Sequence, residues 1–313
     1  MPHMSHPFRF AVQSSRTATL ADWRRLAHRV EDTGYSTLYI PDHLGDHFGP
    51  LVALTVAAEA TTRLRVGSLV FDNDYRHPVV LAKEIATLDL ASEGRLEFGL
   101  GAGWLTTDYD ESGIALDPAA VRVARMVEGL AIMRSLWSQE RTTFAGSYYT
   151  VTEAQGLPRP YSRPHPPIVI GGGSRRILSI AAREADIVGI NPDLRSGHIG
   201  AEVVATVGPE RFDERLGWVR DAAGDRFERL ELQVLTYLVM VAPNRAELIE
   251  RLAPGLGAAP EVAAETPIAL IGTVEEICDQ LQARRERWGL SYIVVHEPEI
   301  EAFAPVVARL AGT

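Results

Sequence analysis

His43 is the residue of this chain whose type and position are best suited to proton transfer. It stands in the segment PDHLGDHFGP, residues 41–50, directly after the apolar run TLYI. Imidazole titrates near neutral pH, so a histidine in a loop at a strand end is suited to act as a general acid. Asp42 precedes it. Because adjacent side chains point apart, Asp42 need not contact His43 and can instead orient the backbone or hold a polar network. We interpret His43 and Asp42 as catalytic; the alternative is a turn in which Asp42 caps and His43 is merely exposed.

The run GGGSRR, residues 171–176, is a candidate anion site. Successive amides of Gly172, Gly173 and Ser174 at a helix start form a concavity that favours negative charge, and the helix dipole adds to it. Arg175 and Arg176 can supply a charge-assisted hydrogen bond, although one of two adjacent arginines must point elsewhere. The segment therefore predicts a phosphate site, and the alternative is a plain glycine turn with a serine cap and solvated arginines.

The stretch GRLEFGLGAGW, residues 94–104, places four glycines around a strand and ends on Trp104. Glycine permits positive φ or the close approach of a backbone to another group, and a large ligand is one such group. The same pattern is also typical of a tight turn without any ligand. The residues alone leave both interpretations open.

Strand patterns and helix patterns alternate along the chain and must position these residues. Thr19 is expected to begin a helix that Gly34 ends, and Thr273 with Glu276 has the spacing of a capping box. The expected strands are residues 8–13, 37–41, 64–70, 95–100, 168–173, 186–190, 230–242 and 291–297. The main expected helices are residues 19–33, 50–62, 78–92, 119–137, 174–185 and 273–288. Residues 142–167 predict a small hairpin and an ordered loop, and residues 254–267 predict a loop.

This alternation predicts an α/β fold of one domain over residues 1–313. About eight strand and helix units favour a closed (β/α)8 TIM barrel, with insertions after strands 4, 5 and 7, over an open doubly wound sheet. In such a barrel, the loops at the carboxyl ends of the strands carry the chemistry. The segments around His43, Trp104 and Ser174 are such loops.

Composition limits the class of function. The chain has 313 residues, 46% of them hydrophobic, and a formal net charge of −10 without a basic block. A nucleic-acid partner is therefore not expected. The single cysteine, Cys278, is expected in a helix core, which leaves no cysteine-cluster metal site. No run is apolar and long enough to span a membrane, and a cytoplasmic protein that binds no metal is expected.

Several of these motifs, in this order, resemble the bacterial luciferase-like flavin and deazaflavin oxidoreductases. They are PDH, RHPVVLAKEIATLDLASEGRLEFGLGAGW, PPIVIGGGSRRILSIAAREAD and IGTVEEICDQLQARRERWGLSYIVV. Within that superfamily the chain is most similar to the branch that uses the deazaflavin coenzyme F420. The resemblance implies hydride transfer between C5 of the deazaflavin and a small organic substrate, with reduction favoured. The alternatives are an FMN-dependent monooxygenase and a non-catalytic flavin-binding protein.

The resemblance also implies cofactor contacts. In similar proteins the loop after strand four lies along the cofactor, which here implicates Gly101, Ala102 and Gly103. A non-prolyl cis peptide in strand three often supports the cofactor ring, and by position it would join Ser68 to Leu69.

A partly apolar substrate pocket is expected beside this cofactor. Trp104 stands where some sugar-phosphate dehydrogenases of the family carry a catalytic glutamate, so a sugar phosphate is not expected as substrate. The candidate pocket residues are His47, Phe48, Phe71, Trp104 and Tyr109, with Asp72 or Asp74 as a polar handle. Asn191 and Arg195 can reach the cofactor tail or the pocket, and His77 is expected to be structural.

The helices expected at residues 50–62 and 78–92 carry more apolar surface than one core-facing stripe needs. Similar proteins pair through this region, so a homodimer is expected.

Overall fold

The computed structural model describes residues 6–14, 18–194, 196–198, 206, 208–256 and 259–313. The chain divides into two compact units. Unit 1 contains Met1–Gln13, Arg29–Thr37 and Ile170–Thr313, and unit 2 contains Ser14–His28 and Leu38–Val169. The GGGS segment thus belongs to unit 1, whereas His43 and the loop that ends on Trp104 belong to unit 2. A single domain over residues 1–313 stays a prediction.

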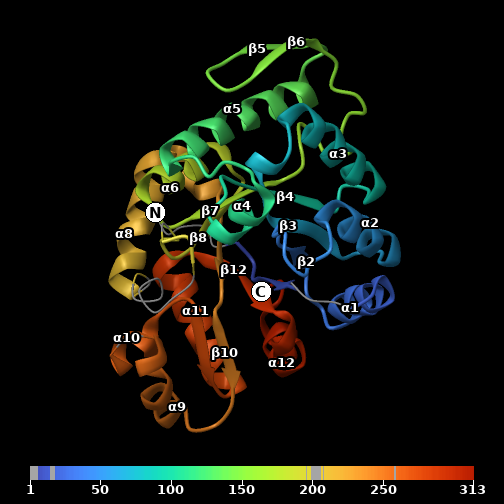
Figure 1. Ribbon diagram of the computed structural model, residues 1–313. Coiled ribbons are helices and arrows are strands. Elements are labelled where there is room, and N and C mark those ends of the chain that lie inside the picture. The colour runs from blue at the N-terminus through green and yellow to red at the C-terminus, as the bar shows by residue number, and fades with distance from the viewer. Residues whose placement is uncertain (1–5, 15–17, 195, 199–205, 207, 257–258) are drawn as a thin grey trace. The chain divides into compact units, whose positions relative to one another are not determined.

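Within the described residues, eight strands close into a barrel in the order β1-β12-β9-β8-β7-β4-β3-β2 (Figure 1). The barrel strands are β1 (Arg9–Gln13), β2 (Thr37–Ile40), β3 (Arg65–Asp72), β4 (Leu96–Gly101), β7 (Ile168–Gly172), β8 (Ile187–Ile190), β9 (Glu231–Leu235) and β12 (Leu290–His296). Their pairing is parallel, for example between β3 and β4 and between β1 and β12. The predicted TIM barrel is confirmed, and the open sheet is excluded.

Helices follow most of the barrel strands. The α-helices of the described residues are α1 (Leu20–Asp32), α2 (Pro50–Ala60), α3 (Pro78–Ala91), α4 (Thr106–Ser112), α5 (Ala119–Ser138), α6 (Arg175–Glu184), α8 (Pro209–Ala223), α9 (Arg245–Leu252), α10 (Pro260–Glu265), α11 (Val274–Trp288) and α12 (Ile300–Leu310). Short 3-10 helices are η1 (Asn73–Tyr75), η3 (Gly224–Arg229), η4 (Ala253–Leu256) and η5 (Glu297–Glu299). The predicted capping box of Thr273 and Glu276 begins α11 as expected. The short helix α4 was not predicted from the sequence.

Additional elements interrupt the barrel pattern at two predicted places. β5 (Thr142–Ala145) and β6 (Thr150–Ala154) form the predicted antiparallel hairpin, which lies along α5 in Figure 1. The apolar run at 230–242 is broken after β9, and β10 (Leu238–Val241) pairs with β11 (Ala269–Gly272) in a separate small sheet. The predicted insertion after the fifth barrel strand is wrong: α6 follows β7 almost at once, and the longer connection comes after β8.

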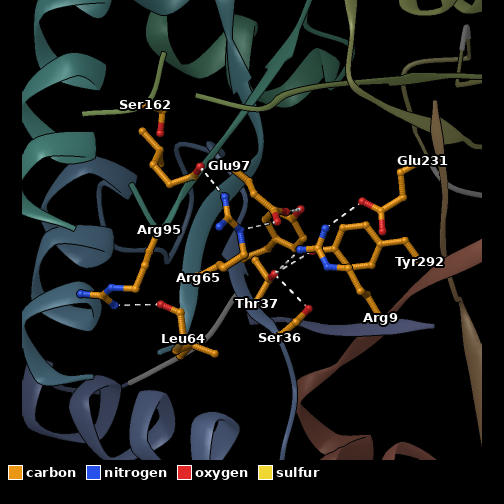
Figure 2. Close-up of polar contacts among 12 residues, drawn as sticks. Arg9, Ser36, Thr37, Leu64, Arg65, Arg95, Glu97, Ser162, Glu231 and Tyr292 are labelled. Atoms are coloured by element: carbon orange, nitrogen blue, oxygen red, sulfur yellow. Dashed lines mark hydrogen bonds and ion pairs between the residues drawn. The ribbon is translucent and has the colours of Figure 1, made fainter. Parts of the chain in front are cut away.

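At the amino-terminal ends of the strands, charged side chains of unit 1 are paired with one another. Arg9 donates to Glu231 at 2.7 Å and to the Thr37 hydroxyl at 3.3 Å, as Figure 2 shows. Its guanidinium also lies 4.3 Å from the ring centroid of Tyr292, whose hydroxyl donates to Thr37 at 2.8 Å. Because every group here has a partner within the fold, we interpret these contacts as stabilising.

Unit 2 has a similar arrangement at the same ends of its strands. Arg65 donates from Nε to Glu97 at 2.8 Å (Figure 2), and the Tyr39 hydroxyl donates to the other oxygen of Glu97. The Glu97 side chain is fully buried, so these two donors compensate a charge that would otherwise be costly. This end of the barrel therefore has a structural role. Catalytic residues are expected at the opposite end, where the carboxyl ends of the strands lie.

Two further expectations concern the chain as a whole. Cys278 is buried in α11, as predicted. None of the helices in the described part of the chain is long and apolar enough to cross a membrane.

Candidate active site

His43 is paired with a buried carboxylate. Its Nδ1 lies 2.6 Å from Oδ2 of Asp108, which α4 places in the interior of unit 2. The same carboxylate accepts hydrogen bonds from the Leu44 amide at 3.3 Å and from the Tyr75 hydroxyl at 3.2 Å. Asp108 therefore fixes both the ring of His43 and the start of the loop that follows it.

This pairing decides which nitrogen of His43 can exchange a proton. The Asp108 carboxylate also accepts hydrogen bonds from the Leu44 amide and the Tyr75 hydroxyl, so it acts as an acceptor. We therefore assign a proton to Nδ1 of His43, which donates it to this carboxylate. No described residue makes a hydrogen bond to Nε2. The His43 side chain is 27% exposed, whereas that of Asp108 is 6% exposed. Nε2 is therefore the atom through which His43 can pass a proton to a bound molecule, while Asp108 holds the ring in place.

Two rings of the predicted pocket lie beside His43. Trp104, after β4, meets it edge to face, with centroids 5.6 Å apart and an interplanar angle of 80°. The His47 ring lies 6.0 Å away on the loop after β2. The structure thus brings His43, His47 and Trp104 together, and the indole supplies a flat apolar surface next to the imidazole.

Asp42 is part of a different network. Its carboxylate accepts from Arg76 at 2.5 Å and 3.0 Å, and Oδ2 also accepts from the Asp72 amide at 3.0 Å. Asp42 is buried, which raises its pKa, and the Arg76 guanidinium opposes that shift. The structure therefore gives Asp42 a positioning role in place of the predicted catalytic one, since its oxygens join the loop after β2 to the end of β3. The sequence also allowed this role, in which Asp42 holds a polar network.

Asp72, at the end of β3, shares a hydroxyl group with a second carboxylate. The Tyr109 hydroxyl lies 3.0 Å from Oδ2 of Asp72 and 3.1 Å from Oδ2 of Asp74. The hydroxyl has one proton, so it donates fully to only one of these two oxygens at a time. Asp74 accepts two hydrogen bonds from Arg125, at 2.8 Å and 2.9 Å. Burial raises the pKa of Asp72 to about 7, so the neutral form of this carboxyl is favoured in the fold.

Three other predicted pocket residues contact the protein interior. Phe71 is 0% exposed and packs against Phe98, with centroids 6.0 Å apart. Tyr109 is 1% exposed, with its hydroxyl between two carboxylates. Phe48 packs edge to face against Trp23, with centroids 6.5 Å apart. The prediction that Phe71 and Tyr109 line the substrate pocket is wrong for this structure, because neither has surface to offer a ligand.

The glycine loop after β4 is explained by packing within unit 2. A Cβ on Gly101 would meet a side chain of β3, and one on Gly103 would meet the Tyr109 hydroxyl. Gly103 also has a φ of +72°, which favours glycine. Arg122 donates to the carbonyl oxygens of Ala102 at 3.3 Å and of Gly103 at 2.5 Å. The tight turn accounts for these glycines, and contact of the loop with a cofactor stays a prediction.

Strand β3 contains a non-prolyl cis peptide, but one bond later than predicted. It joins Leu69 to Val70, not Ser68 to Leu69. The pairing of β3 with β4 shifts register between Ser68 and Phe71, so the irregularity surrounds this bond. Ser68 itself is buried and donates its hydroxyl to the carbonyl oxygen of Ile40 at 2.9 Å. The sequence resemblance located the feature in the right strand and misplaced it by one residue.

In unit 1, the GGGS segment leads directly into α6. Ser174 is the N-cap residue and makes no side-chain capping bond, so it does not occupy the first amides of the helix. The Gly172 carbonyl accepts from the Asn191 amide at 3.0 Å, and both Arg175 and Arg176 are exposed. The predicted candidate Arg195 lies outside the described residues.

A cavity of about 420 Å³ adjoins this helix start. It is lined by Gly173, Ser174, Arg175, Asp193, Thr206, Arg211, Glu214, Arg215 and Trp218. A Cβ on Gly173 would meet the backbone of Pro192 and Asp193, so only glycine allows this close approach. The uncapped amides and the arginines of the lining have the charge and donors that a phosphate group needs, and phosphate binding here stays a prediction.

Sequence reasoning missed several residues that the structure places at these sites. Asp108 lies on an unpredicted helix, and its only signal was an acid one turn beyond the glycine loop. Arg76 and Arg125 neutralise buried carboxylates of unit 2, and Arg215 is buried beside the GGGS segment. Such partners come from distant parts of the sequence, so spacing did not reveal them. Among the described residues, no group of three or more histidine, cysteine or acidic side chains is arranged to hold a metal ion.

Comparisons with known proteins agree with this architecture. An uncharacterized protein of Mycobacterium tuberculosis is 32% identical over 197 residues, covering 55% of this chain and 67% of the relative. An F420-dependent glucose-6-phosphate dehydrogenase of Amycolatopsis mediterranei is 31% identical over 170 residues, and the match spans 51% of this chain and 50% of the enzyme. Limonene 1,2-monooxygenase of Rhodococcus erythropolis is 27% identical, with 87% of this chain and 74% of the enzyme covered.

Solved structures share the fold. The F420-dependent tetrahydromethanopterin reductase of Methanopyrus kandleri superposes with a TM-score of 0.76 at 17% identity, covering 98% of this chain and 99% of the reductase. A monooxygenase of Streptomyces bottropensis gives a TM-score of 0.74 at 24% identity, with 96% and 97% covered. The family model described as luciferase-like monooxygenase matches residues 2–252. The chain therefore belongs to the luciferase-like monooxygenase family, a family of oxidoreductase enzymes.

Proposed function

We propose that this protein is an F420-dependent oxidoreductase that transfers a hydride between C5 of the deazaflavin and a small, partly apolar organic substrate, acting as a reductase. The observation that carries the proposal is the His43–Asp108 pair, which leaves Nε2 of His43 available beside the indole of Trp104. The F420 dependence of relatives such as the Amycolatopsis dehydrogenase supports the choice of cofactor. The chemistry that the deazaflavin supplies when bound is hydride transfer.

The residues of unit 2 would handle the substrate and its proton. His43 would hold a proton on Nε2 and release it to the reduced substrate, while Asp108 keeps the ring oriented. Trp104 and His47 would exclude water from one side of the substrate. The contacts of Ser68, Leu69 and the loop 101–103 with the cofactor ring remain part of the proposal.

The residues of unit 1 would hold the phosphate of the cofactor. Both FMN and F420 carry a phosphate, so the amides of Gly172, Gly173 and Ser174 suit either one. Only the deazaflavin continues beyond it into a lactyl and polyglutamyl tail with several carboxylates. Arg175 is exposed at the start of α6 and would lessen their repulsion from a chain of net charge −10.

A second candidate is an FMN-dependent monooxygenase. The observation that favours it is the coverage of limonene 1,2-monooxygenase, since the match spans 87% of this chain. Binding of the two cofactors separates the candidates.

We expect micromolar binding of F420, weaker binding of FMN, and an F420 affinity that decreases with salt. The salt effect follows from the charges of the phosphate and tail, which ions screen. Isothermal titration calorimetry with both cofactors at two ionic strengths measures this. Tight FMN binding without measurable F420 binding would replace the reductase proposal with the monooxygenase.

We also propose that the chain forms a homodimer through α2 and α3. Val52 on α2 is 62% exposed, and Val80 on α3 is 52% exposed, on helices whose other apolar residues are largely buried. Exposed apolar surface of this kind is typical of interfaces. Sedimentation velocity at micromolar concentration tests the proposal, and a purely monomeric protein would contradict it.

A further inference from the structure

Arg215 is a buried cation without a carboxylate partner. It lies on α8 and is 4% exposed. Its Nε donates to the Gly173 carbonyl at 3.0 Å, and its Nη1 donates to the Thr206 carbonyl at 2.6 Å. No carboxylate of the described residues lies within ion-pair distance, and no described residue accepts from Nη2. A buried charge without a counter-charge is costly, so this position calls for an anion.

The cavity beside α6 is where that anion can lie. Arg215 lines this cavity of about 420 Å³ together with Ser174, the uncapped N-cap residue of α6. The positive end of the helix dipole and the buried guanidinium therefore act on the same space. By holding the Gly173 carbonyl, Arg215 also fixes the orientation of the peptide that leads into the helix. Two independent features thus point to an anionic ligand at one place.

The charges of the lining indicate how many negative charges the ligand carries. Three arginines and two acids line the cavity, namely Arg175, Arg211, Arg215, Asp193 and Glu214. Arg211 pairs with Glu214 at 3.1 Å on the exposed side of α8. The acids lie close enough to Arg215 to raise its pKa, although burial outweighs them and lowers it. The lining is left with one net positive charge, which a singly charged phosphodiester neutralises. A phosphomonoester carries close to two negative charges at neutral pH.

We propose that Arg215 is the buried counter-charge for the phosphodiester of the cofactor, and that Asp193 and Glu214 make the site favour a diester over a monoester. The site would therefore distinguish F420, whose phosphate is a diester, from FMN, whose phosphate is a monoester. The identity of the cofactor rests on the function proposed above, whereas the anion site rests on Arg215 and the cavity alone.

Matched ligands with and without phosphate test the role of Arg215. We expect Arg215→Gln to weaken F420 binding by tenfold or more and to leave the same deazaflavin without its phosphate and tail unchanged within about twofold. Arg175→Gln is the control on the same cavity, and because Arg175 is exposed its effect is expected to be about threefold or less. Equal losses for both ligands would show a merely structural role, and no loss for F420 would remove Arg215 from the site. Either result overturns the proposal.

The acidic residues test the preference for a diester. Glu214→Gln removes an exposed negative charge, so FMN binding should tighten more than F420 binding. Equal changes in both affinities would overturn the charge preference. Glu214 is exposed on α8, so this variant keeps the test available should Arg215→Gln fail to fold.

Inorganic phosphate separates the anion site from the proposed function. We expect millimolar phosphate to raise the Tm of the wild type more than that of Arg215→Lys, which keeps the charge and loses the fork of donors. Should neither cofactor bind, this difference would still support the anion site while the F420 function fails. No effect of phosphate on the wild type would overturn the anion site.

Discussion

His43→Ala is expected to retain cofactor binding while substrate turnover falls about a hundredfold or more. This is the usual contribution of a general acid that transfers a proton in the transition state. The side chain lies outside the packed core, and Asp108 keeps its bonds from the Leu44 amide and the Tyr75 hydroxyl, so the fold should persist. Single-turnover kinetics with a bound cofactor, together with calorimetric binding, measure the two effects separately.

His77→Ala is the matched control for this variant. His77 is exposed and caps α3, where its Nδ1 accepts from the Val79 amide at 3.3 Å. Its removal should cost about 1 kcal/mol of stability, as for other N-cap residues, and leave turnover unchanged. Added imidazole should restore part of the lost turnover in His43→Ala. Unchanged turnover in His43→Ala, or equal losses of binding and stability, would remove His43 from the mechanism.

Asp72→Asn is expected to flatten the dependence of stability on pH. Burial raises the pKa of Asp72 from its ordinary value of 3.8 to about 7, so the folded state binds a proton that the unfolded state releases. The free energy of unfolding should therefore decrease as the pH rises from about 4 to 7, by an upper limit of about 4 kcal/mol. Asparagine keeps the geometry of the neutral acid, since it can donate to Tyr109 and accept from the Asp74 amide. The variant should thus be at least as stable as the wild type at pH 8.

Urea denaturation at pH 5 and at pH 8 measures this difference. Asp110→Asn is the control, because Asp110 is exposed on the same short helix α4 that carries Tyr109. It removes the same charge, and its pH dependence should match that of the wild type. An Asp72→Asn protein that loses several kcal/mol at both pH values would show that Asp72 is ionised in the fold.

Most of the barrel was predictable because its signals are local. Apolar runs, glycine stops and the capping box at Thr273 each depend on a few neighbouring residues, and they located the barrel strands and the main helices. The long apolar run at 230–242 was misleading, because its second half pairs with β11 outside the barrel, and nothing local distinguishes the two halves. The helix α4 is short and polar, so it carries no periodic signal.

The site was predictable only where one residue type carried the signal. His43 was singled out by its chemistry and position and Trp104 by the family resemblance, and the structure places the two rings together, while their roles stay predictions. Asp108 was missed because its importance comes from a contact with a residue 65 positions away. Phe71 and Tyr109 were assigned to the pocket because they are aromatic, although burial, which no local pattern revealed, gives them core positions.

Turnover with each reduced cofactor tests the central claim most directly. The wild-type protein would be incubated with reduced F420 or reduced FMN and a panel of enones, imines and nitroaromatics, while oxidation of the cofactor and formation of product are followed. We predict substrate-dependent oxidation of reduced F420 in a one-to-one ratio with a reduced product, without oxygen being required. Turnover only with reduced FMN and oxygen, yielding an oxygenated product, would contradict the account.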